Sequence, residues 1–197
     1  MTSIQSKKKI LEIRWHGRGG QGAKTAALLL ADAVLGAGKH IQAFPEYGPE
    51  RMGAPVQSYN RISDEPITLH CGITSPDIVI VLDSSLIDVV DVTHGLADDG
   101  MILVNTSLSA ERIKKKLGIE KQKVFVVNAS QIAKEAIGRN IPNTPMLGAL
   151  IGITKLLEKD AFIADTRAKL EKKFKSKPEI IDGNIQAIER AMKEVLG

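Results

Sequence analysis

The stretch Trp15-His16-Gly17-Arg18-Gly19-Gly20-Gln21-Gly22 decides how the rest of this sequence is interpreted. It lies between the apolar run Ile10 to Ile13, which predicts a strand, and the Ala/Leu-rich run Ala23 to Leu35, which predicts a helix. Three of its glycines have the G-x-G-x-x-G spacing, which is meaningful only between a strand and a helix. Residues 17–22 are named the glycine loop below.

The glycine loop has the features of an anion site. Glycines lack the Cβ atoms that keep a ligand away from backbone N–H groups, and a helix beginning near Ala23 directs its free amides to the same place. The basic residues Arg18 and Lys24 and the histidine His16 lie close by in the sequence. Glycines also serve tight turns and close packing of a helix on a strand, and a strand-ending histidine also satisfies local backbone groups. Both interpretations stay open.

The length and composition suit one α/β domain. The 197 residues are 43% hydrophobic, which is enough to bury a substantial core. We expect a single domain over residues 1–197, with residues 160–197 as its C-terminal helical part. The apolar runs are too short to span a membrane and no apolar signal region follows the basic N-terminus, so we expect a cytoplasmic location and no membrane contact.

Several kinds of site are not expected on this chain. Its one cysteine, Cys71, allows no internal disulfide and cannot hold an iron–sulfur cluster by itself, and we expect it to be a small buried side chain. The four histidines lack the spacing of metal ligands, so no metal site is predicted. The net charge of +4 is mildly basic, but no basic stripe alternates with aromatic residues, which argues against nucleic-acid binding.

Strand-like and helix-like segments alternate along the chain. This alternation predicts a mostly parallel sheet with helices on both faces, a Rossmann-like α/β fold, with further helices at the C-terminus. Val56 to Ile62 and Ile67 to Cys71 are predicted to pair as a hairpin, and Lys177-Pro178 is predicted to separate the last two helices. The other predicted strands are 9–15, 40–44, 77–82, 101–104 and 123–127, and the other predicted helices are 23–38, 84–90, 109–117, 130–138 and one that begins at Pro145 with Asn143 or Thr144 as its cap.

The expected ligand position is the carboxyl edge of the sheet. The glycine loop, the segment Pro45 to Pro55, Asp83, Asn105 and Asn128 all follow predicted strands, so we expect them to converge there. The segment has no clear period and mixes an aromatic residue, charges and turn formers, which favours a functional segment over a disordered one. Asp83 has a competing role as the cap of the short helix that follows it.

Three motifs in sequence order resemble those of one protein family. They are Gly17-Arg18-Gly19-Gly20-Gln21-Gly22, then Phe44-Pro45-Glu46-Tyr47-Gly48-Pro49-Glu50-Arg51-Met52-Gly53-Ala54-Pro55, then Asn143-Thr144-Pro145-Met146-Leu147-Gly148-Ala149-Leu150. Together they resemble the gamma subunit of pyruvate (2-oxoacid):ferredoxin oxidoreductases over nearly the whole chain. The resemblance implies a complex of anaerobic metabolism that converts a 2-oxoacid and coenzyme A (CoA) to acyl-CoA and CO2 while reducing ferredoxin. The overall resemblance favours pyruvate, which gives acetyl-CoA.

The resemblance also implies where the cofactors lie. Thiamine diphosphate, Mg and 4Fe-4S clusters belong to companion alpha, beta and delta subunits or their fusions, whereas the gamma subunit helps assembly and contributes to a shared CoA site. This chain is therefore expected to carry no catalytic residue and no complete active site. The candidate CoA-binding residues are Gly17, Arg18, Gly19, Gly20, Gln21, Gly22, Lys24, Glu46, Arg51, Asn143 and Thr144.

Two other functions fit parts of the sequence. A free-standing NAD(P)-dependent dehydrogenase would use the same glycine spacing, with Glu46 near the position of a ribose-binding acid, although no second, substrate-binding domain is evident. A purely structural subunit would keep the glycine loop and bind no small molecule. Titration with NADH and with CoA distinguishes the dehydrogenase from a subunit that binds CoA. CoA binding by the assembled complex that is equally tight after Gly19→Val would favour the structural subunit.

Overall fold

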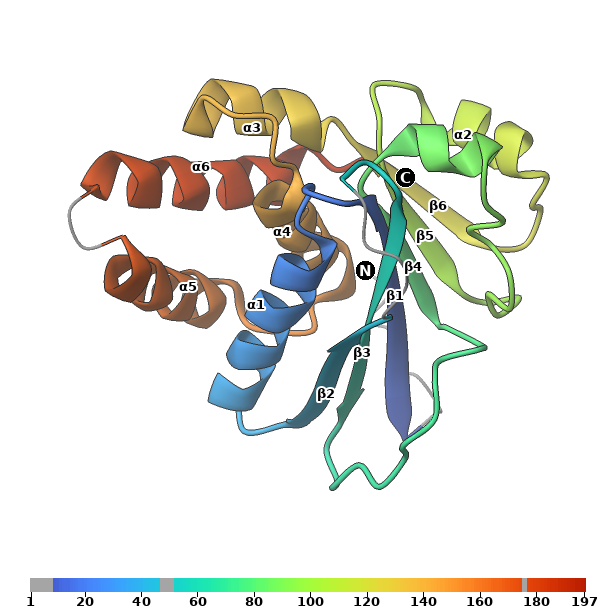
Figure 1. The fold of residues 1–197 in the computed structure, drawn as a ribbon, viewed down its shortest axis with the longest axis horizontal. Helices are drawn as coiled ribbons and strands as arrows, with labels where there is room; N and C mark the ends of the chain where they lie inside the picture. Colours follow the sequence, from blue (N-terminus) through green and yellow to red (C-terminus); the bar gives the residue numbers. More distant parts are fainter. Residues whose placement is uncertain (1–8, 47–51, 175–176) are drawn as a thin grey trace.

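The computed structural model describes residues 9–46, 52–174 and 177–197 of the chain. Its strands are β1 (Ile10–Arg18), β2 (His40–Pro45), β3 (Pro55–Ser63), β4 (Ile78–Val81), β5 (Met101–Asn105) and β6 (Lys123–Val127). They form one sheet in the order β2-β3-β1-β4-β5-β6 (Figure 1). Neighbours from β1 through β4 and β5 to β6 pair in parallel, whereas β3 runs antiparallel to both β1 and β2. The prediction of a mostly parallel sheet is confirmed, with a reversed strand inserted beside β1.

The described helices differ in how their ends are capped. They are α1 (Ala23–Gly36), the short 3-10 helix η1 (Ser84–Asp88), α2 (Ala110–Leu117), α3 (Ala129–Ile137), α4 (Asn143–Thr154), α5 (Lys159–Lys173) and α6 (Pro178–Glu194). At the start of α2 the Ser109 side chain accepts a hydrogen bond from the Arg112 N–H, and Gly118 ends that helix in the left-handed conformation. Pro178 begins α6 after the end of α5, so the predicted separation of the last two helices is confirmed.

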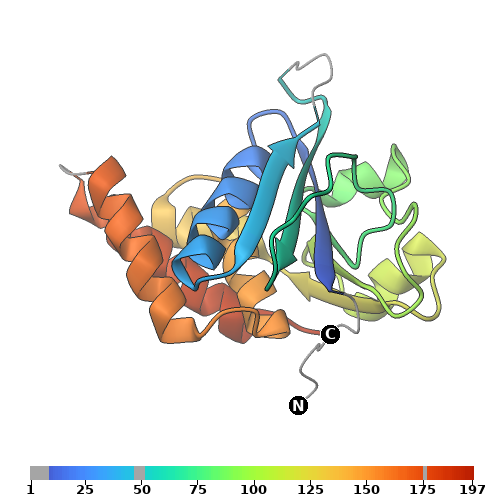
Figure 2. The same cartoon turned by 90° about the horizontal axis from the view of Figure 1, so that it is seen from below.

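Helices cover both faces of the sheet, but unequally (Figures 1 and 2). Successive side chains of a strand point to opposite faces. Ile78 and Ile80 of β4 therefore join the apolar core under α1, α3, α4, α5 and α6, whereas Val79 and Val81 join a smaller core under η1 and α2. All four of these β4 side chains are 2% exposed or less, as the predicted strand buried on both faces requires.

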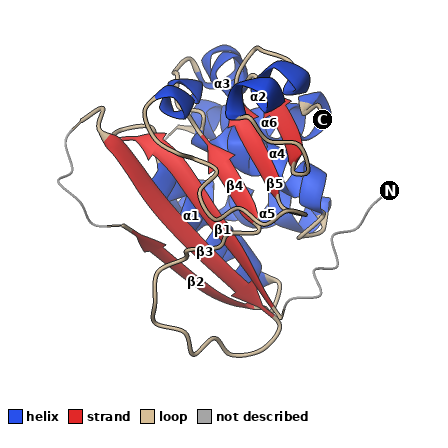
Figure 3. Ribbon diagram, turned by 90° about the vertical axis from the view of Figure 1, so that its right-hand side faces the viewer, coloured by secondary structure: helices blue, strands red, loops and turns tan. Residues whose placement is uncertain are grey.

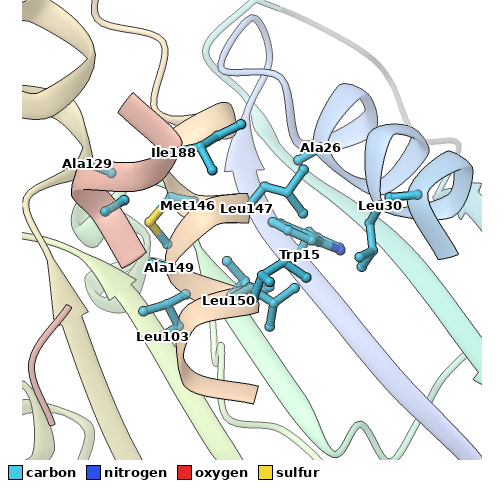
Figure 4. Close-up of a cluster of buried hydrophobic side chains, with 14 of the residues drawn as sticks. Trp15, Ala26, Leu30, Leu103, Ala129, Met146, Leu147, Ala149, Leu150 and Ile188 are labelled. Carbon is cyan, nitrogen blue, oxygen red and sulfur yellow. The ribbon is translucent and has the colours of Figure 1, made fainter. Parts of the chain in front are cut away.

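Trp15 links three elements in the centre of the larger core (Figure 4). Its ring is fully buried beside Ala26 and Leu30 of α1. Its Nε1–H donates to Asn60 Oδ1 of β3 at 2.8 Å, and Asn60 Nδ2 in turn donates to the carbonyl oxygen of Ala27 at 3.0 Å. Because every buried polar group in this chain of hydrogen bonds is paired, the arrangement fixes β1, β3 and α1 relative to one another.

Helix α4 passes through the middle of the larger helical layer, and its close approach to α6 depends on glycine. A Cβ on Gly148 would lie 2.5 Å from the carbonyl oxygen of Ile188, and one on Gly152 would lie 3.1 Å from that of Met192. These glycines let the two backbones touch. The third sequence motif therefore contributes packing in addition to its helix start.

The predicted hairpin of Val56 to Ile62 with Ile67 to Cys71 is wrong. β3 is paired on both sides by β1 and β2, and residues 67–71 form no strand. The guanidinium of Arg61, whose residue is only 1% exposed, instead donates to the carbonyl oxygens of Cys71 and Gly72 at 2.7 and 3.0 Å. One buried side chain thus replaces a strand ladder, and Cys71 is exposed rather than buried as expected. Figure 3 shows the face of the sheet on which β2 and β3 lie in front of α1.

We expect Gly148→Ala to lower the free energy of unfolding by about 1 to 3 kcal/mol, because the added methyl group would push α6 away from α4. Urea denaturation of the purified chain measures this change. The matched control is Gly72→Ala, since a Cβ at Gly72 meets no atom within 4 Å. Equal stability of the two variants would contradict the close approach of α4 and α6.

Candidate functional site

The glycine loop begins inside β1 and ends at the first residue before α1. The strand continues to Arg18, so Gly17 is a strand residue, and a Cβ on it would lie 3.1 Å from Leu82 Cδ1 and 3.3 Å from Ala23 Cβ. Gly17 therefore serves the close packing of helix and strand. Gly22 has φ of 85°, a left-handed conformation that favours glycine, and it is the N-cap of α1.

The reversed direction of β3 brings the second sequence motif to the glycine loop. Arg18 of β1 lies opposite Pro55 of β3, and β2 ends where Pro45 lies opposite Ser58. The segment between β2 and β3 therefore starts and finishes at the carboxyl edge of β1. Backbone hydrogen bonds join the two motifs, from Gly19 N–H to the Ala54 oxygen at 2.9 Å and from Gly53 N–H to the Gly19 oxygen at 3.2 Å. Arg51 lies outside the described residues.

The side chains of Arg18 and Gln21 are used to shape the loop. Arg18 Nε lies 3.3 Å from Asp83 Oδ2, and its two Nη atoms donate to the Gly53 oxygen and to Ser85 Oγ. Gln21 accepts from the Arg18 N–H at 2.8 Å and donates to Asp83 Oδ2 at 2.7 Å. The Arg18 charge is thus balanced by a carboxylate, and it is less available to a phosphate than the sequence suggested.

Asp83 combines the two roles that the sequence left open. Its side chain accepts from the Ser85 N–H at 3.0 Å, so it caps η1 as expected, and it also anchors the glycine loop through Gln21 and Arg18. Burial alone would raise the pKa of Asp83, but the hydrogen bonds from Ser85 and Gln21 and the charge of Arg18 outweigh it and lower this pKa. The carboxyl is therefore ionised at neutral pH.

A hollow of about 460 Å³ opens between the N-terminus of α1 and the ends of β2 and β3. The N-terminus of α1 has no side-chain cap, so the N–H groups of its first turn are left for solvent or a ligand. Lys24 is exposed in this turn, and Glu46 lies on the opposite wall at the end of β2. The lining residues are Arg18, Gly19, Gly20, Gly22, Ala23, Lys24, Thr25, Pro45, Glu46, Met52, Val56, Gln57 and Ser58. The hollow therefore brings together six of the candidate residues.

Asn143, Thr144 and Asn105 do not line the hollow. Asn143 and Thr144 are 7% and 6% exposed, and a Cβ on Gly22 would lie 2.7 Å from Asn143 Nδ2, so the start of α4 supports the loop from its buried side. Asn105 donates to the Leu82 oxygen and to Ser130 Oγ, which ties the end of β5 to β4 and α3. None of these residues lines the hollow, and a direct contact of Asn143 or Thr144 with CoA stays a prediction.

Arg14 is a buried basic residue next to the glycine loop that was not predicted from the sequence. Arg14 is 4% exposed; its Nε donates to His16 Nε2 at 3.0 Å, and its Nη2 donates to the carbonyl oxygens of Val92 and His94 at 3.1 and 2.6 Å. Burial, and then the charge of Arg14, lower the pKa of His16 from 6.5 to about 3. His16 is neutral and does not line the hollow. The polar alternation of Glu12, Arg14 and His16 along β1 was the available signal, because it marks one face of the strand as polar.

Within residues 9–46, 52–174 and 177–197, no helix has both the length and the apolarity needed to cross a membrane. The same residues include no group of three or more histidine, cysteine, aspartate or glutamate side chains arranged to hold a metal ion.

The fold and the hollow define a Rossmann-like subunit with a glycine loop at the carboxyl edge of its first strand. The chain belongs to the pyruvate ferredoxin/flavodoxin oxidoreductase family, whose sequence profile matches residues 12–194. Within this family the predicted gamma subunit of a 2-oxoacid:ferredoxin oxidoreductase is confirmed by the relatives that follow.

Two curated relatives and one solved structure are similar to most of the chain and of their own length. Pyruvate synthase subunit PorC of Thermotoga maritima is 47% identical over 95% of this chain and 96% of its own length. The pyruvate/ketoisovalerate oxidoreductases common subunit gamma of Pyrococcus furiosus is 48% identical over 80% of this chain and 86% of its own length. The crystal structure of the Thermotoga maritima subunit superposes with a TM-score of 0.84 at 46% identity, covering 96% of this chain and 98% of that one.

A larger enzyme contains the same fold. The 2-oxoglutarate:ferredoxin oxidoreductase of Magnetococcus marinus, solved with 2-oxoglutarate, coenzyme A and succinyl-CoA bound, matches with a TM-score of 0.75 at 21% identity. The match covers 95% of this chain but 31% of that one. At this identity the likeness shows the shared fold.

We expect His16→Gln to remove a large part of the acid sensitivity of folding. The folded-state pKa of His16, about 3, lies below its ordinary value of 6.5, so between these values the unfolded chain binds a proton that the folded chain does not. Stability is therefore lost as the pH falls through this window. Between about pH 7 and about pH 5 the wild type should lose about 2 kcal/mol more than the variant, in which glutamine still accepts from Arg14.

Urea denaturation at both pH values measures this difference. His70→Gln, which replaces an exposed histidine, is the control for the loss of a histidine that lies away from Arg14. Identical pH dependences of the wild type and His16→Gln would show that His16 is not held neutral.

Proposed function

We propose that this gamma subunit belongs to a complex that converts pyruvate and CoA to acetyl-CoA and CO2, and that its hollow binds the phosphate-bearing end of CoA. The complex would contain alpha, beta and delta companions or their fusions in the cytoplasm. Those companions would hold thiamine diphosphate, Mg and 4Fe-4S clusters, and ferredoxin would accept the electron pair that leaves with the formation of the thioester. In this chain residues 1–197 act as one domain.

The hollow at α1 is the observation that carries the proposal. A helix N-terminus with uncapped N–H groups, a glycine loop and an exposed lysine together attract phosphate groups. Lys24 is the cation that we assign to the phosphates, because Arg18 is already paired with Asp83. Gly20 is exposed with φ of 95° and a Cβ there would meet no atom within 4 Å, so its backbone is open to an approaching ligand.

The chemical role of this chain would be positioning. CoA enters the reaction through its thiol, which must reach an acyl group formed on the companion subunits. Thiamine diphosphate supplies the carbanion chemistry there. The Lys24 side chain and the amides of α1 would hold CoA by its phosphates, which lie far from the thiol in the molecule. The rest of CoA would then be restricted to the companion active site, which raises the effective concentration of the thiol there.

The names of the relatives support the choice of substrate. One is a pyruvate synthase subunit and another is a subunit common to pyruvate and ketoisovalerate oxidoreductases. A subunit that serves two oxoacid oxidoreductases fits a task that does not depend on the oxoacid, such as binding CoA or assembly. The free-standing dehydrogenase loses its support, because the matched family consists of oxidoreductases of the pyruvate ferredoxin/flavodoxin type.

We expect Lys24→Ala in the assembled complex to raise the KM for CoA about fivefold to tenfold, which corresponds to roughly 1 to 1.4 kcal/mol for one lost charge–phosphate contact. The kcat and the KM for pyruvate should stay within twofold of the wild type, because the oxoacid binds elsewhere. Steady-state kinetics with ferredoxin as acceptor measures these constants. Lys134→Ala, an exposed lysine of α3, is the matched control.

A second variant distinguishes CoA binding from a purely structural role. Gly19→Val would place a branched side chain in the loop and should raise the KM for CoA at least as much as Lys24→Ala. If both variants assemble normally and leave the KM for CoA unchanged, the hollow does not bind CoA and the structural subunit is the better description.

A further inference from the structure

The acidic wall of the hollow is held by a buried phenol. Tyr59 on β3 is 8% exposed, and its Oη donates to Glu46 Oε2 at 2.7 Å. The Glu46 backbone is fixed as well, since its N–H donates to the Gln57 oxygen at 3.1 Å. Glu46 itself is exposed, so an acid at the surface is tied down at both its backbone and its side chain.

The contacts of Tyr59 identify Glu46 as the acceptor of its proton. Tyr59 Oη also lies 2.8 Å from Gln57 Oε1, but a phenol has one proton and a carboxylate is the stronger acceptor. The Tyr59 ring is fixed in turn by Phe44 of β2, with ring centroids 5.3 Å apart. Burial and the bond to Glu46 both raise the pKa of Tyr59, so the hydroxyl remains a donor at all working pH values.

The position of Glu46 makes this arrangement relevant to a ligand. Pro45 and Glu46 line the glycine-loop hollow and also a second hollow of about 760 Å³ on the other side, where Tyr59 lies. Glu46 is thus the boundary between them. A carboxylate accepts hydrogen bonds and repels phosphate, whereas the wall at α1 carries Lys24 and free N–H groups. The two walls of the hollow therefore differ in charge, with a carboxylate on one wall and a cation and free N–H groups on the other.

We propose that Glu46 binds hydroxyl or amino donors of the nucleoside end of CoA while the phosphates lie at α1, and that Tyr59 is the positioning residue that holds Glu46 for this contact. This inference rests on the proposed function, because it assigns the second wall of the same hollow. It adds an orientation, with the nucleoside towards β2 and the phosphates towards α1. A phosphate placed at Glu46 would be repelled, which disfavours the opposite orientation.

The test uses the assembled complex with three variants. Glu46→Ala removes the acceptor, Tyr59→Phe removes the hydroxyl and keeps the ring, and the double variant removes both. We expect Glu46→Ala to raise the KM for CoA about tenfold and Tyr59→Phe about fivefold, as expected for a lost or misplaced hydrogen bond to a charged group. The kcat and the KM for pyruvate should not change. The inhibition constant of adenosine 3′,5′-bisphosphate should rise by the same factors, because this probe contains only the nucleotide end.

Non-additivity separates positioning from a structural effect. If Tyr59 acts through Glu46, the double variant should be no worse than Glu46→Ala alone. Ser63→Ala is the matched control, since it removes a hydroxyl from the other end of β3 and should leave the KM for CoA unchanged. Thermal midpoints and the elution volume of the complex show whether each variant folds and assembles. If Tyr59→Phe does not fold, Glu46→Ala still tests the contact, because Glu46 is exposed.

The outcomes distinguish this inference from the proposed function. Unchanged CoA and bisphosphate constants in Glu46→Ala, with a raised KM in Lys24→Ala, would overturn the inference and leave the CoA site standing. Additive effects of Tyr59→Phe and Glu46→Ala would overturn the positioning role of Tyr59. If Glu46→Ala raises the CoA and bisphosphate constants and Lys24→Ala does not, the nucleoside contact is supported and the phosphate assignment is rejected. If no variant changes these constants, both are rejected.

Discussion

The antiparallel pairing of β3 with β1 is the constraint on which the other features of this protein depend. It is fixed by the hydrogen bonds that run from Trp15 through Asn60 to the backbone of α1. A slip of one residue would turn Trp15 and Asn60 to opposite faces of the sheet. Since β3 starts opposite the end of β1, this register also decides that the segment after β2 returns to the glycine loop.

The electrostatics of the carboxyl edge follow from that placement. Arg18 would be the obvious phosphate ligand, but Asp83, brought there by the neighbouring strand β4, balances its charge and caps η1 as well. The uncapped amides of α1 and Lys24 remain on one wall of the hollow and Glu46 on the other. Such a separation of charge suits a ligand that carries phosphate groups next to uncharged hydrogen-bond donors, as the nucleotide end of CoA does in the proposed function.

The same structure explains which site residues could be recognised from the sequence. The glycine spacing predicted the loop and its position because it depends on local geometry between one strand and one helix. Tyr59 and Arg14 carried no motif, and their importance comes from partners that are distant in the sequence, such as the His94 oxygen. Asn143 was recognised as a helix start, but its contact with Gly22 depends on α4 crossing behind the loop. The expected hairpin failed because Arg61 ties residues 71 and 72 to β3 without a ladder.

The sequence by itself determined most of the element types, the mostly parallel sheet, the family and the position of the glycine loop. These properties depend on hydrophobic periodicity, caps and short motifs, which act within a few residues of one another. Only the tertiary structure decided that β3 is reversed and that Arg18 is neutralised by Asp83. It also decided that Glu46 is held by Tyr59, and that Asn143 and Thr144 lie behind the loop rather than in the hollow. The physical reason is that these pairings are chosen by burial and hydrogen-bond satisfaction among segments far apart in the chain, which no local pattern records.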